Sequence, residues 1–526
     1  MAIPPIPPTP FTAEGISAAG GITTGLDVAY AGPGIDAFAY IQGVLDMAAL
    51  AVGSRVTTTV MVPSAHFRLS NMLVIPDNVH LVGIDQATSI LDVSGVNMLT
   101  CMVAVSTQNT RVANFTIIGS GQGSQPANHA GVAPSDVAAA GSGIVFAGVS
   151  GGRIENVTIR DCGGTTGVAP YNGVAGIWLT YGCTDCVVQY SSVVNCRNGI
   201  NQDNYFQSSP HGNKIVKNWI SGCRFGIADD CDDAAYDTLI SGNSIYDCQQ
   251  SGIDLNKSQL TKVVYNYVEG CGIQNGNHGI WEYGTPSIPA FDNIIQNNTV
   301  VGCGGAAGGY TGSGIKSGPE VYYTSISGNV CKENAGRGIL ILGQNRYWKV
   351  SENTCRENGL SGYYIYQVDG SNVVTTGELC GNIALQNSQN GFLFDGAAEI
   401  SVVGNTAKDN GRSSANVYDG FRLTNGTTLC TFVGNQSSGG FQRYALAGTD
   451  SGTTGNTFSS NILQAGASGR IAFANLVQNW GDNADGYITA AGSPTGVYPY
   501  GSRVYNTGDL KLYIRDQTGW KSVTLT

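Results

Sequence analysis

A short phrase recurs along the middle of the chain: a glycine, an apolar residue, a few polar or aromatic residues, then an Asn-rich segment and a turn. Successive copies begin 23 to 35 residues apart. The glycines that open the copies are Gly143, Gly176, Gly199, Gly226, Gly252, Gly279, Gly314, Gly338, Gly362, Gly391 and Gly420. A period of this length predicts a stacked-repeat fold, in which the same position of every coil lies along one surface.

The repeats have the pattern of strands. Residues 153–159 and 213–220 largely alternate apolar with polar side chains and are rich in β-branched residues, which is typical of half-buried strands. The 74 glycines are expected in tight turns that need a positive φ. Pairing of each strand with its copy in the next coil then predicts a right-handed parallel β-helix, the handedness being the usual one for parallel crossovers.

Two residue types recur near the turns of this predicted solenoid. Cysteines stand near the end of a strand in six consecutive repeats, and asparagines form a second series. These residues are Cys162, Cys196, Cys223, Cys248, Cys271, Cys303, and Asn218, Asn243, Asn266, Asn298, Asn329, Asn353, Asn382, Asn405, Asn435. We expect mostly reduced cysteines that fill the interior and asparagines that tie turn backbones together.

Composition excludes some classes of partner. The net charge of −11 argues against nucleic acid or an anionic membrane, although an acidic polysaccharide is compatible with a local basic site such as Lys316. No apolar stretch reaches the length of a membrane span, and the N-terminus lacks the pattern of a secretory signal. The lone Cys183-x-x-Cys186 has no second pair with metal-site spacing, so we expect no cofactor and no metal.

The N-terminal third contains a more specific signal. A helical apolar pattern at 35–51 is followed by strand patterns at 58–70 and 73–83, the latter reading Leu-Val-Ile-Pro-Asp-Asn-Val-His-Leu-Val-Gly. This order resembles the opening of β-helix domains of the pectate-lyase superfamily, although Ala65-His66-Phe67 stands where that family usually has Gly-Thr-Tyr. The resemblance covers roughly residues 33–465 and implies a β-helix whose first coil is capped by the helix.

Both flanking regions differ from the repeats. Residues 1–32 are rich in Pro and Gly and are expected to form an extended arm, either lying on a partner or disordered. Residues 466–526 suggest a few antiparallel strands and are similar to short C-terminal β-modules of phage tailspikes. This similarity implies a homotrimer, attachment to a phage tail, baseplate or adaptor protein through the arm, and a location in the virion.

The repeat also predicts which side chains face outward. Because neighbours in a strand alternate, the first and third residues after the inward apolar residue should point out. These positions carry carboxylates, amides and aromatic rings in repeats three to seven, as a sugar chain requires for stacking and hydrogen bonding. The candidate substrate-binding residues are Asn201, Trp281, Tyr283, His278, Lys316 and Tyr364.

Candidate catalytic carboxylates lie on the same repeats. Glycoside hydrolysis usually needs two carboxyl groups, about 5–9.5 Å apart. The candidates are Asp203, Asp229, Asp230, Asp254 and Glu282, of which Asp229 and Glu282 occupy predicted inward positions and would need a kink to be exposed. Asp232 and Asp233 follow at once and favour a solvated turn; calcium binding by this acidic run is an alternative.

Four short motifs resemble those of the polygalacturonase family. They are Asn201-Gln202-Asp203, Asp229-Asp230-Cys231, His278-Gly279 and Ile315-Lys316. The resemblance implies that Asp230 is the acid, that Asp203 and Asp229 activate water, and that Lys316 binds a sugar carboxylate. The chain departs from the family because His278 comes two coils after the Asp pair rather than one, and Ser-Gly replaces an arginine before Ile315.

We therefore predict a tailspike-like protein that binds and hydrolyses a bacterial surface polysaccharide, either lipopolysaccharide O-antigen or capsule. One alternative is a spike or adhesin that binds the same polymer without catalysis. A second is an extracellular polysaccharide lyase or epimerase, which would need a base near neutral pKa and charge neutralisation of a uronate.

Overall fold

The structure is a computed structural model that describes most of the chain. The described residues are 16–17, 21–25, 36–51, 57–123, 140–164, 174–203, 209–230, 235–273, 277–305, 312–367, 375–448, 453, 455–464, 468–473, 479–480, 485–488, 503–506, 511–516 and 519–524. Most of the N-terminal arm and the pair Asp232 and Asp233 lie outside them. The chain divides into two compact units, Met1–Gln249 (unit 1) and Gln250–Thr526 (unit 2), which are described separately.

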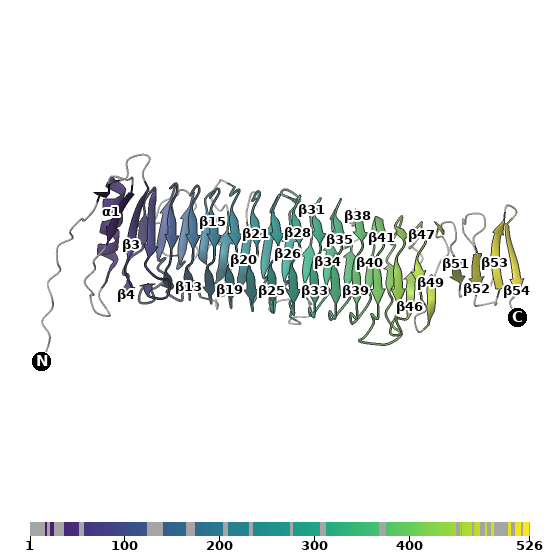
Figure 1. Cartoon of the computed structure of the whole chain (residues 1–526). Helices are drawn as coiled ribbons and strands as arrows, with labels where there is room; N and C mark the ends of the chain where they lie inside the picture. Colours follow the sequence, from purple (N-terminus) through teal and green to yellow (C-terminus); the bar gives the residue numbers. More distant parts are fainter. Residues whose placement is uncertain are drawn as a thin grey trace. The chain divides into compact units, whose positions relative to one another are not determined.

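Unit 1 consists of short strands in three parallel sheets, visible as rows of arrows in Figure 1. The first sheet contains β3 (Thr58–Val62), β6 (Val79–Gly83), β9 (Arg111–Ala113), β12 (Arg153–Glu155), β15 (Val187–Gln189), β18 (Lys214–Val216) and β21 (Leu239–Ser241). The second contains β4 (Ala65–Arg68), β7 (Ser89–Asp92), β10 (Thr116–Ile118), β13 (Thr158–Arg160), β16 (Ser192–Val194), β19 (Trp219–Ser221) and β22 (Ser244–Tyr246). The third contains β5 (Leu73–Ile75), β8 (Met102–Val105), β11 (Ile144–Ala147), β14 (Ala175–Thr180), β17 (Asn198–Gln202) and β20 (Phe225–Asp230).

Unit 2 repeats this plan. Its first sheet contains β24 (Lys262–Val264), β28 (Ile294–Gln296), β32 (Ser325–Ser327), β35 (Lys349–Ser351), β38 (Thr375–Cys380), β41 (Ala398–Val403), β44 (Thr431–Val433), β47 (Thr457–Ser459) and β50 (Asn479–Trp480). Its second contains β25 (Tyr267–Glu269), β29 (Thr299–Val301), β33 (Val330–Lys332), β36 (Thr354–Arg356), β39 (Ile383–Leu385), β42 (Thr406–Lys408), β45 (Gln436–Ser438) and β48 (Ile462–Leu463). Its third contains β23 (Ile253–Asn256), β26 (Ile280–Tyr283), β30 (Ile315–Ser317), β34 (Ile339–Leu342), β37 (Tyr363–Tyr366), β40 (Phe392–Asp395), β43 (Phe421–Thr424), β46 (Tyr444–Gly448) and β49 (Gly469–Phe473). A short pair, β27 (Ala290–Phe291) and β31 (Val321–Tyr322), also runs parallel.

This arrangement is the parallel β-helix that the repeat predicts. Each strand pairs in register with its copy one coil later, so that Ile253, Ile280, Ile315 and Ile339 form one buried column of unit 2. The same column continues with aromatic rings that stack at 4.6 and 4.7 Å between centroids, Tyr363 on Phe392 and Phe392 on Phe421. Identical or similar side chains therefore fill the core along the axis of the unit.

The glycines that open the repeats have a different role from the expected one. None of them has a positive φ, so turn geometry does not require them. A Cβ atom on Gly279 would lie 2.3 Å from a methyl carbon of Val300 and 2.7 Å from the carbonyl oxygen of Gly314. Close approach to the core and to the next coil therefore requires glycine here, while many turns place Asn, Asp, Glu or Tyr in the left-handed region.

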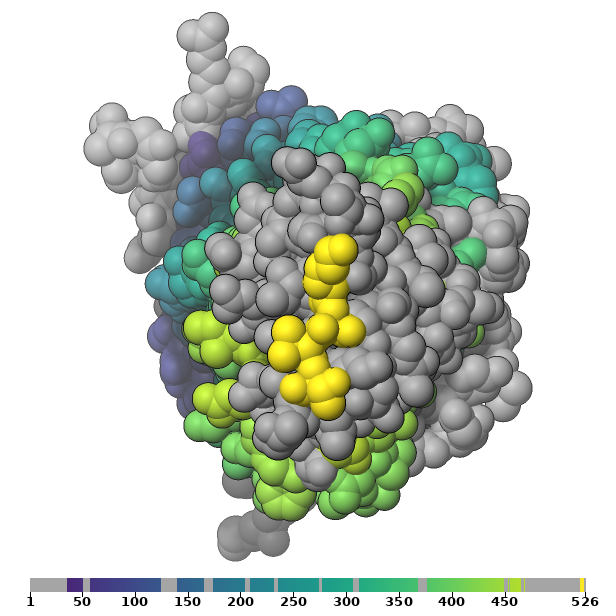
Figure 2. Space-filling model, turned by 90° about the vertical axis from the view of Figure 1, so that its right-hand side faces the viewer, coloured from purple at the N-terminus to yellow at the C-terminus, as the bar shows by residue number. Residues whose placement is uncertain are grey.

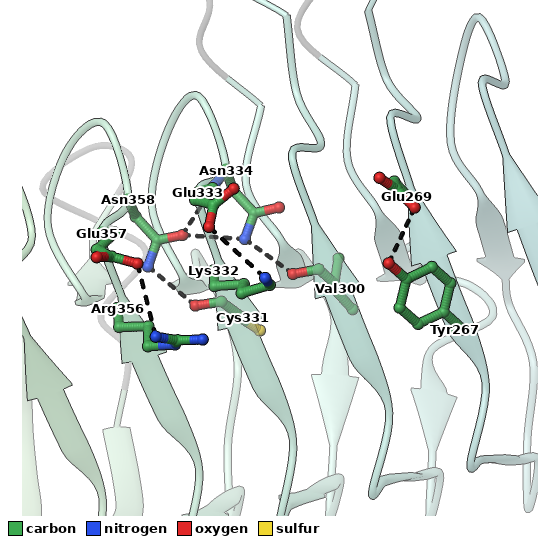
Figure 3. A network of polar contacts seen from close by, with 10 residues as sticks. All are labelled: Tyr267, Glu269, Val300, Cys331, Lys332, Glu333, Asn334, Arg356, Glu357 and Asn358. Carbon is green, nitrogen blue, oxygen red and sulfur yellow. Dashed lines mark hydrogen bonds and ion pairs between the residues drawn. The ribbon is translucent and has the colours of Figure 1, made fainter.

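Asparagines form the expected ladders along the turns. In unit 2 the backbone N–H of Asn298 donates to Oδ1 of Asn329 (2.9 Å), and Nδ2 of Asn298 donates to the carbonyl oxygen of Val263 (2.8 Å). A second ladder continues the position of the cysteine series, because the N–H of Cys303 donates to Oδ1 of Asn334. Figure 3 shows its next step, from Asn334 to Asn358 (2.9 Å). These amides satisfy buried backbone groups that the turns leave unpaired.

The cysteine series is buried and reduced. All cysteines of the described part of the chain are free, and all but the half-buried Cys380 are buried. Cys183 and Cys186 are free as well, and their thiols donate to backbone carbonyl oxygens of Phe146 and Val149. The described residues contain no group of three His, Cys, Asp or Glu side chains that could hold a metal ion.

Helix α1 (Phe38–Ala51) and two short strands of the N-terminal arm lie against the sheets of unit 1. The helix forms where the sequence predicts one, and it lies against β3, β5 and β6. Two arm segments, β1 (Ile16–Ser17) and β2 (Gly21–Gly25), pair antiparallel with each other, and β2 extends the first sheet by pairing with β3. Among the described residues, no helix has the length and apolarity required to cross a membrane.

At the C-terminal end of unit 2, coil pairing extends beyond residue 465, because β49 pairs with β46 and β50 with β47. A four-stranded sheet follows, composed of β51 (Asp485–Ile488), β52 (Arg503–Asn506), β53 (Lys511–Asp516) and β54 (Gly519–Thr524). β52, β53 and β54 are antiparallel, whereas β51 and β52 are parallel. The end of β54 is exposed and appears in yellow in Figure 2.

Candidate functional site

The outer face of the third sheet of unit 2 carries a column of side chains, most of which are charged or aromatic. The register places them directly opposite one another on consecutive strands. In order they are Asp254, Trp281, Lys316, Leu340, Tyr364, Leu393 and Arg422. Consecutive members stand about 4.8 Å apart along the axis of the unit, the spacing between paired strands. The Gly-apolar repeat therefore predicts this column correctly.

Trp281 is the centre of a cluster on this face. Its ring stacks on Tyr283 with a centroid distance of 4.4 Å, and His278 meets it edge-on at 5.4 Å. The ammonium of Lys316 lies 4.5 Å from the centre of the Trp281 ring. Trp281, Tyr283 and Lys316 are half-buried, so that parts of two rings and one cation remain accessible to solvent. Four predicted binding residues thus lie together in one cluster, and three of them, Trp281, Tyr283 and Lys316, reach the surface.

Two cations dominate the electrostatics of this cluster. Burial lowers the pKa of Lys316 to about 8; the nearby Asp254 carboxylate opposes this effect, and the charge of Arg337 adds to it. Burial also lowers the pKa of the Arg337 guanidinium. Within the described part of the chain neither cation forms a salt bridge within 4.0 Å. Two desolvated positive charges that repel each other therefore share one face.

His278 is fixed in its neutral form. The backbone N–H of Ser313 donates to Nδ1 at 2.8 Å, so the ring proton of the neutral imidazole resides on Nε2. Burial, together with the charges of Lys316 and Arg337, lowers the pKa of His278 well below its usual value. His278 is 6% exposed. It can donate a hydrogen bond through Nε2 but does not supply a third positive charge.

Arg337 is supported from the next coil. Its guanidinium lies 4.8 Å from the centre of the Tyr364 ring, and Tyr364 stacks on Tyr366 at 5.1 Å. The Tyr364 hydroxyl donates to Oδ2 of Asp395 at 2.6 Å, and Asn425 donates to the other oxygen. Tyr364 is only 9% exposed. The predicted sugar contact at Tyr364 is therefore mostly a contact with protein groups.

The candidates of unit 1 are less accessible. Asp203 is 1% exposed, and it accepts hydrogen bonds from the Trp178 indole (2.8 Å), the Thr180 hydroxyl (2.5 Å) and the Asn201 amide (2.8 Å). Asn201 is fully buried. The register pairs Gln202, the last residue of β17, with Asp229, so Asp203 directly follows β17 and Asp230 ends the neighbouring strand β20. Asp230 is half-buried and is the most exposed carboxylate among the candidates of this unit.

Two candidate carboxylates lie inside the solenoid. Asp229 is fully buried and accepts a hydrogen bond from Gln202. Glu282 is also fully buried and accepts from the Asn293 amide (2.9 Å) and from the hydroxyls of Thr324 (2.7 Å) and Ser317 (3.0 Å). No kink exposes either side chain, so their positions do not fit contact with a substrate. Asp254, at 6% exposure, faces outward beside Lys316 instead.

Sequence reasoning missed Arg337 and Asp395. The Gly-apolar pattern predicts the direction only of residues that follow it, whereas Arg337 directly precedes Gly338. Asp395 does occupy an outward third position, after Phe392, but in a repeat beyond the third to seventh, where the candidate carboxylates lie. His278 holds the same position before Gly279, and the two belong to a column whose carbonyl groups accept hydrogen bonds from the glycines of the preceding coils. Reading this column as well would have added Arg337 to the predicted cluster.

Comparison with known proteins agrees with the fold. The family model described as "Right handed beta helix region" matches residues 101–317 and 273–437, more than half of the 526 residues. A search of curated protein sequences gave no match.

Several solved structures share the architecture at low sequence identity. The A-module of a mannuronan C-5 epimerase from Azotobacter vinelandii is 13% identical and aligns over 86% of this chain and 96% of its own, with a TM-score of 0.35. The Dettilon tailspike protein is 15% identical (87% and 70%, TM-score 0.41). An α-1,3-glucanase of family GH87 from Streptomyces thermodiastaticus is 13% identical (72% and 66%, TM-score 0.44). Similarity at this level carries no information on activity, but the family match and the coiled architecture agree, and the chain belongs to the right-handed β-helix family.

Proposed function

We propose that the protein binds an acidic polysaccharide along the outer face of the third sheet of unit 2. The observation that carries this proposal is the pair of desolvated cations, Lys316 and Arg337, beside the half-buried rings of Trp281 and Tyr283. Burying a cation without a partner costs free energy, and an anionic ligand offsets that cost. An acidic sugar chain supplies both a carboxylate for the cations and a sugar face for the rings.

The geometry favours a polymer over a small molecule. The column extends over seven consecutive strands of unit 2, from Asp254 to Arg422, and continues on both sides of the two cations. Each coil adds about 4.8 Å to this surface. A ligand that uses the whole column must be extended and repetitive, as a polysaccharide is.

We place this activity at the bacterial surface, with the polymer being a capsule or lipopolysaccharide O-antigen. The support is the Pro-rich N-terminal region, the C-terminal four-stranded sheet and the similarity of the tail to phage β-modules. In this proposal the protein is a homotrimeric tailspike that attaches to the virion through residues 1–32. Light scattering of the purified chain and adsorption assays on the host test these two points.

A second candidate function adds a reaction at this cluster. Lys316, with its pKa near 8, is partly neutral at physiological pH, which suits a general base. A neutral amine can take the C5 proton of a uronate while Arg337 neutralises the carboxylate. The resulting carbanion then has two alternative fates. If the C4 oxygen leaves with its sugar and takes up a proton, an unsaturated uronate forms; if a proton instead returns to the other face of C5, the epimer forms. This observation favours a lyase or epimerase over binding alone.

Hydrolysis remains the prediction for unit 1. It requires Asp203, directly after β17, and Asp230, at the end of β20, to act as a carboxylate pair. The three donors around Asp203 hold it in one orientation but leave it little exposed. Mass analysis of fragments released from host capsule or lipopolysaccharide separates the reactions. Fragments heavier by one water than the internal repeat indicate hydrolysis, and fragments without that water indicate elimination. If no fragments form, NMR of the recovered polymer separates epimerisation, which changes the configuration at C5, from binding only.

A further inference from the structure

Two arginines at the third sheet of unit 2, Arg443 and Arg337, differ in how an aspartate lies near them. Arg443 binds Asp419 directly through two hydrogen bonds, at 3.1 Å from Nε and 2.8 Å from a terminal nitrogen. These bonds raise the pKa of Arg443. In such a pair the aspartate neutralises the charge of the arginine and accepts hydrogen bonds from two of its N–H groups. Arg443 is therefore unsuited to receive an anionic ligand.

Both arginines lie over an aromatic ring, Arg337 over Tyr364 and Arg443 over Tyr444 at 5.2 Å, but of the two only Arg443 also binds a carboxylate within the described part of the chain. The Arg337 guanidinium lies against the face of Tyr364, at 4.8 Å from the ring centre, and the carboxylate of Asp395 lies beyond the Tyr364 hydroxyl. A ring face attracts a cation without accepting its N–H groups in strong hydrogen bonds. The guanidinium thus keeps its planar set of donors, which matches a carboxylate in bidentate geometry.

The ring itself is held rigidly. The hydroxyl of Tyr364 donates to Oδ2 of Asp395 at 2.6 Å, and the amide of Asn425 fixes Oδ1 of the same carboxylate. Tyr366 stacks on the ring at 5.1 Å from the neighbouring outward position of β37. A tyrosine that donates to a carboxylate also has a more negative ring, which strengthens its attraction for the guanidinium.

We propose that Tyr364 is a positioning residue that holds Arg337 ready for an anionic group of the ligand, and that Asp395 orients Tyr364 for this purpose. This inference rests on the proposed binding of an acidic polysaccharide. It assigns Tyr364 a role other than sugar stacking, and it assigns Asp395 a role without contact with the ligand. It also gives the two carboxylates different roles. Asp419 forms an ion pair with Arg443, whereas Asp395 accepts a hydrogen bond from the Tyr364 hydroxyl.

A double-mutant cycle on the full-length chain tests the proposal, with polygalacturonate as the anionic probe and dextran as the neutral one. Arg337→Gln, Tyr364→Leu and the double variant are compared with the unaltered chain by titration calorimetry. We expect Tyr364→Leu to weaken polygalacturonate binding about tenfold, equivalent to about 1.4 kcal/mol. Tyr364→Leu should have no further effect once Arg337 is replaced, because it acts through that residue.

Tyr364→Phe is the conservative variant, since it keeps the ring face and loses only the bond to Asp395. We expect it to weaken polygalacturonate binding by about threefold, less than Tyr364→Leu does, because the ring face remains but Asp395 no longer orients it. Arg443→Gln, on the same sheet, is the control arginine and should leave affinity unchanged. Thermal melts identify any variant that fails to fold; if Tyr364→Leu does, Tyr364→His replaces it in the cycle.

The outcomes separate the inference from the function on which it rests. If Arg337→Gln and Lys316→Met both leave polygalacturonate binding unchanged, the proposed function itself is wrong. If Arg337→Gln weakens binding but the effect of Tyr364→Leu is absent or fully additive with it, the positioning role is overturned. Non-additive loss in Tyr364→Leu, with a smaller loss in Tyr364→Phe, supports both roles. Unchanged affinity of Tyr364→Phe would overturn the role of Asp395.

Discussion

The ammonium of Lys316 lies 4.5 Å from the centre of the Trp281 ring, on the adjacent strand of the third sheet of unit 2. This contact lets a buried cation persist without a carboxylate bonded to it, because the ring face replaces part of its lost hydration. It also joins the two chemical features that an acidic sugar presents, a negative charge and an apolar ring face. Both features are therefore recognised within one step of the solenoid.

Ligand binding should depend on pH through Lys316. Its pKa near 8 means that the ammonium is charged at pH 6.5 and mostly neutral at pH 9.5. We expect the affinity for polygalacturonate to fall as the pH rises through this range, which calorimetry at constant ionic strength would measure. Lys316→Arg is the control, since a guanidinium remains charged throughout and should give a flat profile. Equal pH dependence in both proteins would contradict the assignment.

Glu282 should influence stability rather than recognition. Burial raises the pKa of this carboxyl group despite three hydrogen-bond donors, so the folded state retains its proton to higher pH than the unfolded state does. Its stabilising contribution is therefore complete at low pH and is lost as the pH rises through the raised pKa. Glu282→Gln stays neutral, so its free energy of unfolding relative to the unaltered chain should increase with pH.

Glu282→Ala provides the contrast. It leaves the donors of Asn293, Thr324 and Ser317 without their acceptor and should cost about 2–4 kcal/mol at low pH. This cost should become smaller as the pH rises, because alanine, like glutamine, does not ionise. Denaturant unfolding at pH 5 and pH 8 distinguishes the two variants. A pH-independent difference between Glu282→Gln and the unaltered chain would show that the buried carboxyl does not change its ionisation in this range.

The second asparagine ladder should be a local determinant of stability. Asn358 receives bonds from the N–H and the side chain of Asn334 and donates to the carbonyl oxygen of Cys331, as Figure 3 shows. Replacing it by alanine leaves these buried groups unpaired, which predicts a loss of about 2–4 kcal/mol. Lys332→Ala, at the exposed pair with Glu333, should change stability by less than about 0.5 kcal/mol. Similar losses in both variants would contradict the role of the ladder.

Thiol chemistry should report the burial of the cysteine series. Cys380 is the one half-buried cysteine among the described residues, and burial raises the pKa of ladder thiols such as Cys196 and Cys223. We expect a thiol reagent to modify Cys380 in the native protein far faster than it modifies the ladder. Peptide mapping after labelling, with Cys380→Ser as control, measures this difference. Rapid labelling of Cys196 or Cys223 in the folded protein would contradict the structure.

The sequence predicts the fold well because the same packing constraint applies to every coil. Each coil must bury an apolar residue after a glycine with no room for a side chain, and Gly279 shows this clearly. The same regularity predicts the outward direction of Trp281, Tyr283 and Lys316. The expectation of positive φ is confirmed at many turn glycines but not at the glycines that open the repeats, because a crowded approach and a positive φ favour the same residue type.

Exposure is less predictable than direction. Asp203 and Tyr364 occupy outward positions but are almost fully buried, because side chains from neighbouring coils surround them and take their hydrogen bonds. Those partners lie 25 and 31 residues away in the chain, beyond the reach of a local pattern. The Gly-apolar pattern does not predict the position of Arg337, because this residue precedes the glycine instead of following the apolar residue.

The central claim is that Lys316 and Arg337 bind the negative charges of a sugar chain. The most direct measurement is a calorimetric titration of polygalacturonate at several salt concentrations into the unaltered chain, Lys316→Met, Arg337→Gln, and the control Lys349→Met, whose residue lies on the first sheet beside Glu378. The account predicts about tenfold weaker binding for each of the first two variants, a smaller salt dependence, and no change for the control. Equal affinity of all four proteins, or binding of dextran as tight as that of polygalacturonate, would contradict it.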